Sequence, residues 1–320
     1  MNAVTDLSAR AMLVDLRFSC WLPDRIDAPI TQEVAEKYDV RAEVAGRYKK
    51  NLIDPKTPTY RAIRYGLGRM RTRHYWFTLP WTQNGPRILP AASFAAYSQE
   101  MRTARNDWLT VTVPRFLQEW PRLVYKARTD LKGAWRESDY PQDLADRFGC
   151  DLLVLPLPSG ADFRVSLQDA DVAAIRANIT AEVNKGITAA ARVPYERLHD
   201  GVQRIVERLS QEEPQFHDSL ITGLKELCDM LPAMNLTGDG ELEELRLHTL
   251  AMLANVTPQT LRNSGPQRDR VLGTARELTA RMKPRLAETE GLSAQDAAAH
   301  AVLRQAAQVE SNVADLIGGF

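Results

Sequence analysis

The chain has 320 residues, of which 44% are hydrophobic and 26% are charged. These fractions exclude a largely disordered protein, and the length is enough for two or three compact units. The sequence has no apolar run long enough to span a membrane, and its polar N-terminus does not fit a secretory signal peptide. Only three cysteines occur, and they form no CxxC pair, which predicts a reduced, cytoplasmic protein.

Basic and acidic residues are distributed unevenly, although the formal net charge is zero. Residues 1–140 contain 23 Lys and Arg against 15 Asp and Glu, and the remainder contains 18 against 26. Residues 41–74 alone carry ten basic and two acidic residues. This asymmetry favours a charged partner for the front half, or contact between the two halves.

Residues 1–90 are predicted to form a basic N-terminal cap. Apolar and polar residues alternate over residues 13–22, as in a half-buried strand with Cys20 on its apolar side, so that this thiol is expected to be structural. A helix is expected over residues 31–50 with Thr31 as its N-cap. The turn dipeptide Asn84-Gly85 predicts a hairpin between residues 75–81 and 86–89.

Two long helical arms are predicted to follow, over residues 91–137 and 168–209. Apolar residues recur in the first at steps of three and four: Phe94, Tyr97, Met101, Ala104, Trp108 and Val111. The arms are expected to pack antiparallel as a helical hairpin over residues 91–212, with a β-containing tip at 139–167. Residues 213–320 read as a helical bundle. The predicted fold is therefore mainly α with small β elements.

The sequence offers no catalytic, cofactor-binding or metal-binding motif. The five histidines are scattered, and there is no HExxH, GxxxxGK[ST] or GxSxG pattern. An enzyme would require residues that converge from distant positions. A non-enzymatic protein without a cofactor is therefore the prediction.

A run of basic residues interleaved with aromatic residues is the main candidate for a binding site. Basic side chains suit a phosphate backbone, and aromatic rings can stack on bases. The alternative is a solvated face whose arginine stems cover apolar surface. The candidate nucleic-acid-binding residues are Arg47, Lys49, Lys50, Arg61, Arg64, Tyr65, Arg69, Arg71, Arg73 and Trp76. Candidate partner-binding residues at the tip are Asp162, Phe163 and Arg164.

An ordered series of short motifs gives the chain a family resemblance. The series comprises "LVDLRFSCWL", "GPRILP", "FLQEWPRLV", "SDYPQDLADRF", "PLPSGADFRV" and "FHDSLITGLKELCDMLPAMNLTGD". Over residues 12–285 it resembles the bacteriophage and mobile-element family called domain of unknown function thirty-one-fifty. The resemblance implies a bacterial host cytoplasm and a MoxR/CobS-like AAA+ ATPase or CobT-like von Willebrand factor A protein as partner. It implies no catalytic residues.

Two functions are consistent with these features. The first is a non-enzymatic helical interaction or scaffold protein, expected to be a partner or adaptor of a MoxR-like AAA+ ATPase. The alternative is a DNA-binding accessory protein that uses the basic, aromatic stretch at residues 41–76. Exposure of the arginines in that stretch would favour the alternative.

Overall fold

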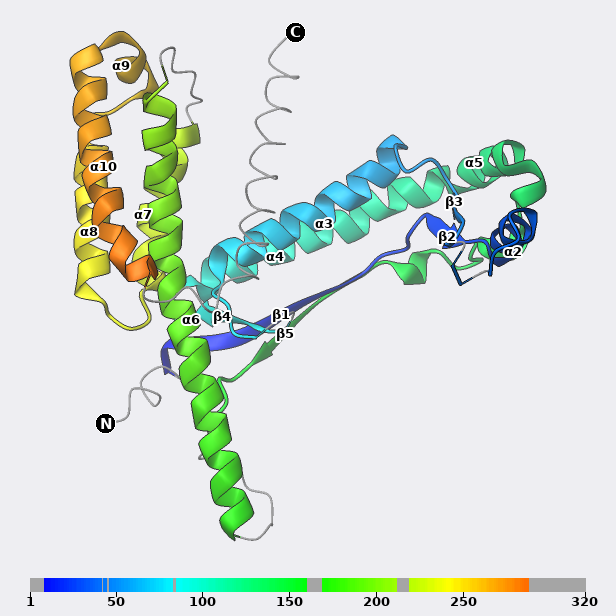
Figure 1. The fold of residues 1–320 in the computed structure, drawn as a ribbon, viewed down its shortest axis with the longest axis horizontal. Helices are drawn as coiled ribbons and strands as arrows, with labels where there is room; N and C mark the ends of the chain where they lie inside the picture. Colours follow the sequence, from blue (N-terminus) through cyan, green and yellow to red (C-terminus); the bar gives the residue numbers. More distant parts are fainter. Residues whose placement is uncertain are drawn as a thin grey trace. The chain divides into compact units, whose positions relative to one another are not determined.

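The fold is mainly helical with small antiparallel sheets, as predicted (Figure 1). The computed structural model describes residues 9–41, 43, 44, 46–82, 85–159, 169–211 and 219–287. The chain forms two compact units. Unit 1 comprises Met1–Asp15, Tyr75–Tyr97 and Leu153–Phe320, and unit 2 comprises Leu16–His74 and Ser98–Leu152. These boundaries differ from the three domains expected from the sequence, because both units combine segments that are distant in the chain.

The predicted N-terminal strand is β1 (Ala11–Ser19), which lies between β4 (Arg87–Pro90) and β5 (Gly149–Leu155) in a three-stranded sheet. β1 and β4 are antiparallel, with Ala11 opposite Pro90 and Val14 opposite Arg87. The strand expected over residues 151–158 is thus confirmed as β5, although it starts and ends earlier. The second expected tip strand, residues 161–166, lies outside the described residues.

The hairpin expected over residues 75–81 and 86–89 is wrong for most of its length. Tyr75 to Phe77 are the last residues of helix α3 (Pro58–Phe77), because His74 and Phe77 continue its buried stripe. Only an isolated bridge between Leu79 and Ile88 remains, closed by two backbone hydrogen bonds of 2.8 Å. Asn84 of the expected turn lies outside the described residues.

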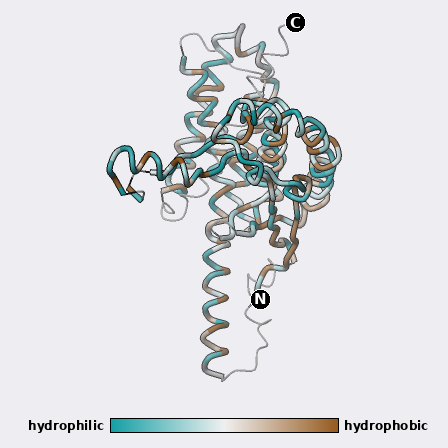
Figure 2. Tube along the Cα trace, turned by 90° about the vertical axis from the view of Figure 1, so that its right-hand side faces the viewer, coloured by the Kyte–Doolittle hydropathy of each residue, from teal (hydrophilic) through white to brown (hydrophobic). Residues whose placement is uncertain are grey.

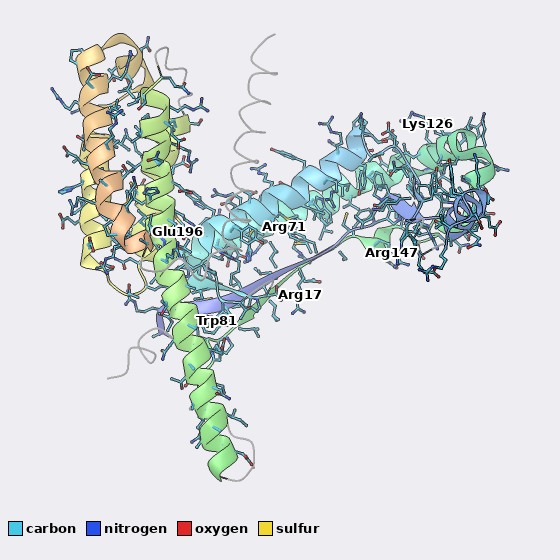
Figure 3. All side chains as sticks on the ribbon, viewed as in Figure 1. Arg17, Arg71, Trp81, Lys126, Arg147 and Glu196 are labelled. Atoms are coloured by element: carbon cyan, nitrogen blue, oxygen red, sulfur yellow. The ribbon has the colours of Figure 1, made fainter. Side chains whose placement is uncertain are left out.

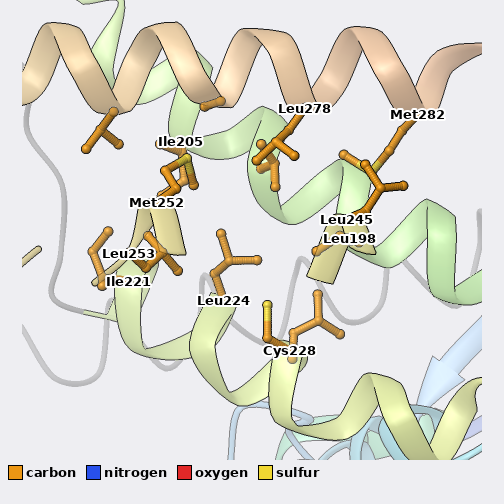
Figure 4. Packing of buried hydrophobic residues seen from close by; sticks show 14 of the residues in the cluster. Leu198, Ile205, Ile221, Leu224, Cys228, Leu245, Met252, Leu253, Leu278 and Met282 are labelled. Carbon is orange, nitrogen blue, oxygen red and sulfur yellow. The ribbon is translucent and has the colours of Figure 1, made fainter. Parts of the chain in front are cut away.

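Unit 1 contains a helical bundle, which confirms the C-terminal helical prediction over residues 219–287 and also includes the predicted second arm; residues 288–320 lie outside the described residues. Its helices are α6 (Asp169–Leu209), α7 (Ser219–Met234), α8 (Gly240–Met252), α9 (Pro258–Asn263) and α10 (Gly265–Ala287). One apolar core joins them, with Leu198 and Ile205 of α6, Leu224 and Cys228 of α7, Leu245 of α8 and Leu278 of α10 among its buried residues (Figure 4). A second cluster places Val193 of α6 with Leu13, Leu79 and Ile88.

The first arm is helical as predicted, but it is interrupted by a wider turn. It consists of the 3-10 turn η1 (Ala91–Ser93), α4 (Phe94–Asp107), the π-helical turn η2 (Trp108–Thr112), α5 (Val113–Leu131) and the 3-10 turn η3 (Lys132–Ala134). A π turn adds a residue to the helical repeat. Val111, expected on the apolar stripe, is therefore exposed, whereas Val113 and Phe116 are buried.

The apolar stripe of each arm is covered within its own unit, whereas the sequence predicted that the two arms would cover each other. The stripe of α6 packs in the bundle core with α7, α8 and α10. In unit 2, α4 and α5 are held against α3 instead, for example by a hydrogen bond of Trp108 Nε1 to the carbonyl of Ile63 at 3.1 Å. Helical periodicity shows that a stripe must be covered but does not identify the covering element.

A small insertion replaces the helix expected over residues 31–50. It contains β2 (Asp24–Ile26), α2 (Ala28–Lys37) and β3 (Lys49–Asn51), with β2 and β3 antiparallel. Asp27, rather than Thr31, is the N-cap, and its side chain accepts from the Ile30 amide. The helix ends at Lys37, and Asp39 has a positive φ of 50° that a helix does not continue through.

The core of unit 2 is rich in aromatic residues. Trp21 lies between Tyr60 of α3 and Phe116 and Trp120 of α5, with ring centroids 5.0–6.4 Å apart. Trp108, Phe148, Trp135 and Tyr140 extend this network. The short 3-10 turns η4 (Glu137–Asp139) and η5 (Ala145–Arg147) carry the chain from α5 to β5.

Apolar residues recur along the helices at intervals and fill none of them continuously (Figure 2). Accordingly, within the described part of the chain, none of the helices combines the length and apolar character that crossing a bilayer requires.

Candidate nucleic-acid interface

Helix α3 is amphipathic, although the two glycines Gly66 and Gly68 weaken its intrinsic helical propensity. It begins with Pro58 in the first turn, where proline is tolerated because no intrahelical amide bond is lost. Its buried residues follow at steps of three and four: Tyr60, Ile63, Leu67, Met70, His74 and Phe77. Packing of this stripe therefore accounts for the helix more than its propensity does.

The opposite half of α3 is exposed and basic. It carries Arg61, Arg64, Tyr65, Arg69 and Arg71, and α3 contains no Asp or Glu. At 1.5 Å per residue, the step from Arg61 to Arg71 spans roughly 15 Å. Small residues, including Gly68 with nothing within 4 Å of the position of an added Cβ, separate the arginines and leave the helix surface open.

Within the described residues, the side chains of Arg61 and Arg69 have no hydrogen-bond or ion-pair partner. The guanidinium of Arg71 lies 5.6 Å from the ring centre of Phe18. Burial raises the pKa of the Cys20 thiol, and the charge and hydrogen bond of Arg64 oppose that rise. Tyr65 is 50% exposed. Two guanidinium groups and one ring are therefore available to a ligand without breaking an internal bond.

Five other residues were predicted to bind nucleic acid. One of them is available to a ligand, and four are engaged within the protein. Arg47 is exposed. Lys49 pairs with Asp24, and Arg73 pairs with Glu100 through two hydrogen bonds. Lys50 is only 3% exposed, and Trp76 packs against the bundle core of unit 1. Burial of Lys50 makes it unavailable to a phosphate, contrary to the prediction, whereas Trp76 is only partly buried. The tip residues Asp162, Phe163 and Arg164 lie outside the described residues.

Lys50 is the centre of a buried charge cluster in unit 2. Its ammonium group lies 2.6 Å from Asp27 Oδ2, 2.7 Å from Asp139 Oδ2 and 2.7 Å from the carbonyl oxygen of Ala134. Arg136 contacts the same Asp27 oxygen at 2.8 Å. A hydrogen bond from Lys50, together with one from Arg136, lowers the pKa of Asp27 to about 2 against the opposing effect of burial.

Two acids around a lysine are also found in catalytic sites, but the geometry of this cluster favours a structural role. An ammonium group has three hydrogens to donate, and three acceptors surround this one. Lys50 is buried and its ammonium group already contacts these internal acceptors, so it is not exposed to a substrate. The cluster instead fastens β3 and the start of α2 to the segment that follows α5.

Helices α3 and α4–α5 run antiparallel in unit 2. Thr59 hydrogen-bonds Glu119, Ile63 accepts from Trp108, and Arg73 pairs with Glu100. Residue numbers thus rise along α3 as they fall along α5 and α4. Close approach depends on Gly66, where an added Cβ would lie 2.5 Å from Trp108 Cδ1.

A second set of exposed basic residues lies on α5, and the sequence reasoning missed it. It comprises Arg115, Arg122 and Lys126, with the 75%-exposed Tyr125 beside them. The available signal was their spacing of seven and four residues, which places them on one helix face. The apolar stripe of the first arm has the stronger periodicity and obscures this signal.

The described residues contain no group of three or more His, Cys, Asp or Glu side chains suited to a metal ion. A cavity of about 470 Å³ in unit 1 lies between α8 and α10, and its polar rim includes His248, Arg270 and Arg281. Arg281 is already engaged by Glu244 at 2.9 Å and by His248 at 3.1 Å. Comparison with protein-family models, curated proteins and solved structures gave no match.

Proposed function

We propose that this protein is a non-enzymatic binding protein that contacts nucleic acid through the exposed half of α3. The observation that supports the proposal is that this half carries four arginines and an exposed tyrosine but no carboxylate. Exposure of the arginines in residues 41–74 is also what the DNA-binding alternative required.

Arginine is suited to this role because its planar guanidinium group donates two parallel hydrogen bonds to a phosphate. The side chains of Arg61 and Arg69 have no partner among the described residues, so binding a phosphate costs no internal ion pair. The repeated fixed charges along one helix match the repeated charges of a nucleic-acid backbone. Unit 2 carries 22 Lys and Arg against 16 Asp and Glu, which adds a favourable long-range field.

The test is a salt titration of binding by fluorescence anisotropy. The double variant Arg61→Ala/Arg69→Ala should bind labelled DNA more weakly and with a shallower salt dependence, the slope of log Kobs falling by roughly 2 for two lost phosphate contacts. The matched control is Arg208→Ala/Arg270→Ala, which removes two exposed arginines of unit 1 and should bind as the wild type does. Absence of wild-type binding at low ionic strength, or equal losses in both variants, would refute the proposal.

A second candidate function is that of a protein-interaction scaffold in a phage or mobile element, with a MoxR-like AAA+ ATPase or a von Willebrand factor A protein as partner. The structural support is a concentration of exposed apolar side chains in and around α2: Leu22, Ile26, Val34, Tyr38, Val40, Val44 and Tyr48. Exposed apolar groups gathered in one segment favour a contact with another protein.

This candidate is tested by co-purification with a MoxR-like AAA+ ATPase and with a CobT-like von Willebrand factor A protein. Capture of either protein, lost in the variant Tyr38→Ser/Val44→Ser and retained in Arg61→Ala/Arg69→Ala, would support the scaffold function. Recovery of neither by the wild-type protein would count against it.

A further inference from the structure

The cavity between α8 and α10 in unit 1 is elongated and follows α10 for most of its length. The α10 residues that line it include a row at steps of four and three: Gln267, Val271, Thr274, Leu278 and Arg281. At 1.5 Å per residue, this row is about 21 Å long. Its side chains belong to the helical bundle on the left of Figure 3. A cavity that extends along a helix in this way has a shape into which another helix can pack.

The lining of this cavity combines apolar and small residues with a basic edge. Met252 lines it and is buried, whereas Ala251 and Ala254 line it and are exposed. Small side chains at a contact allow the axes of two helices to come close. Arg270 also lines the cavity, and within the described residues its exposed side chain has no hydrogen-bond or ion-pair partner. The cavity therefore suits the apolar face of a helix that carries an acidic side chain at its edge.

The sequence that follows α10 predicts a helix of this kind. Residues 288–320 lie outside the described residues, and within them Ser293 and Asp296 have the spacing of a capping box at a helix start. The alanine-rich stretch that follows has high helix propensity. Its apolar residues recur at steps of three and four: Ala299, Val302, Ala306, Val309 and Val313. An apolar stripe of this kind requires a covering surface, because an isolated helix is only marginally stable in water.

The connection between the two helices determines their relative position. Helix α10 ends at Ala287, and only residues 288–292, which include Gly291, separate it from Ser293. Connections of this length are typical of two antiparallel helices that pack side by side. Ala287 then lies at the height of Ser293, and each step back along α10 corresponds to one step forward along the C-terminal helix.

In this register the two rows match position by position. The pairs at equal height are Arg281 with Ala299, Leu278 with Val302, Thr274 with Ala306, Val271 with Val309 and Gln267 with Val313. Glu310 falls at the height of Arg270, and it lies about 40° from Ala306 around the helix, at the border of the apolar stripe. A carboxylate at this position can accept hydrogen bonds from the guanidinium group of Arg270.

We propose that residues 293–317 form a helix that folds back antiparallel to α10 and fills the cavity between α8 and α10, with Ala306 against Thr274 and Glu310 beside Arg270. The occupant is a segment of the same chain, because a five-residue connection gives it a high effective concentration at the cavity. This inference is independent of the proposed function of α3.

Disulfide formation between introduced cysteines tests the proposal in the full-length protein. Thr274→Cys is combined with Ala306→Cys in a Cys20→Ser background, since Cys150 and Cys228 are buried. In a glutathione redox buffer, non-reducing electrophoresis should show an intramolecular disulfide.

The matched control is Thr274→Cys/Gln308→Cys in the same background. Gln308 is at nearly the same height as Ala306 but lies about 200° away around the helix, on its opposite face. The Ala306→Cys pair should react about tenfold faster than the control, because a disulfide requires Cα atoms within about 7 Å of each other.

Exchange of the two charges tests the register. Arg270→Glu or Glu310→Arg, introduced into the Thr274→Cys/Ala306→Cys protein, should slow disulfide formation by roughly two- to fivefold, as expected for the loss of one exposed ion pair. The double exchange Arg270→Glu/Glu310→Arg should restore the rate, because it rebuilds the pair in the opposite sense.

Three outcomes would overturn the proposal. Equal rates for the Ala306→Cys and Gln308→Cys pairs would show that the apolar stripe does not face α10. Disulfide-linked dimers in place of the intramolecular product would show that the cavity receives the segment of a second copy. A double exchange as slow as the single variants would show that Glu310 does not lie beside Arg270. Thermal melting of each variant by circular dichroism establishes that a slower reaction does not reflect unfolding.

Discussion

Gly66 of α3 lies directly against the indole ring of Trp108, with room for a hydrogen atom and none for a methyl group. An added Cβ would be 2.5 Å from Trp108 Cδ1 and 3.2 Å from Nε1. The same indole nitrogen donates to the carbonyl of Ile63, one turn earlier in α3. Trp108 also begins the π turn of the first arm. This contact therefore fixes how closely α3 can approach α4 and α5. It also fixes the position of α3 relative to them along the helix axes.

Gly66→Ala should destabilise the protein by about 1–3 kcal/mol, the usual cost of overpacking a closed core site. Alanine has the higher helix propensity by up to about 1 kcal/mol, but the buried ring cannot move far enough to accept the methyl group. Urea unfolding followed by circular dichroism measures the change.

Gly68→Ala is the matched control for that measurement. It lies in the same helix, and nothing is within 4 Å of an added Cβ. The control variant should be more stable than the wild type by about 0.5–1 kcal/mol, through propensity alone. Similar effects of both substitutions would show that Gly66 and Trp108 are not in close contact.

Replacing Lys50 with methionine should destabilise the protein by about 2–4 kcal/mol. The substitution removes the buried ammonium group that both Asp27 and Asp139 contact, and leaves the partly exposed Arg136 and Arg25 as their remaining charged partners. The neighbouring residue supplies the comparison: Lys49 is exposed and pairs with Asp24, so Lys49→Met should change stability by less than about 1 kcal/mol. Equal effects at the two positions would argue that Lys50 is not buried.

Stability should depend on pH in the acid range through Asp27. The hydrogen bond from Lys50 holds the pKa of this carboxyl at about 2 in the folded protein, below its ordinary value near 4. Its contribution is therefore fully present above about pH 4 and is lost as the pH falls towards about 2. The difference in unfolding free energy between the wild type and Asp27→Asn should shrink over that interval. A constant difference from pH 6 to pH 2 would contradict the lowered pKa.

The sequence predicted most of the helices of unit 1 because apolar residues recur at helical spacing over a long stretch of each helix. It did not predict that the two arms have different partners, since a stripe such as Val202 and Ile205 looks the same whichever helix covers it. It also missed α2, where Asp27 and Pro29 start the helix earlier than Thr31 would. Side-chain capping at one residue decides such boundaries, and several polar residues compete for the role.

The candidate interface was only partly predictable for a related reason. Arg61 and Lys50 both belong to the same basic stretch, yet one is exposed on α3 and the other is buried between two aspartates. Their difference depends on Asp139, which is 89 residues away from Lys50. Charge counts along the chain identify the stretch, but the choice between a phosphate contact and an internal ion pair requires the tertiary structure.

Substitution of Asp239 should lower the stability of unit 1 markedly, because this residue both caps a helix and binds a buried hydroxyl. It is the N-cap of α8, accepting from the amide nitrogens of Glu241 at 2.9 Å and Leu242 at 3.4 Å, and it also accepts from the buried Tyr195 hydroxyl at 2.7 Å. Asp239→Ala should cost about 2–3 kcal/mol, the loss of a cap plus an unpaired buried hydroxyl. Asp239→Asn keeps an accepting oxygen and should cost less than half as much. Urea unfolding of both variants tests this order, and a larger loss for asparagine would exclude the capping role.

Arg197 is predicted to be essential for the stability of unit 1 because it binds the carbonyl oxygens at the end of α3. Its guanidinium group donates to Tyr75 at 2.7 Å, to Trp76 at 2.8 Å and to Thr78 at 2.9 Å. The last carbonyls of a helix lack intrahelical donors and carry partial negative charge, so a buried cation there satisfies both needs.

Arg197→Met should therefore destabilise the protein by about 3–5 kcal/mol, because three carbonyl oxygens lose a charged donor in a buried site. Arg197→Lys should fall between methionine and the wild type, since an ammonium group keeps the charge but cannot reproduce the planar fork that reaches all three oxygens. Urea denaturation midpoints order the three proteins. A lysine variant as stable as the wild type would show that charge alone is sufficient, and a methionine variant as stable as the wild type would show that the carbonyls do not depend on Arg197.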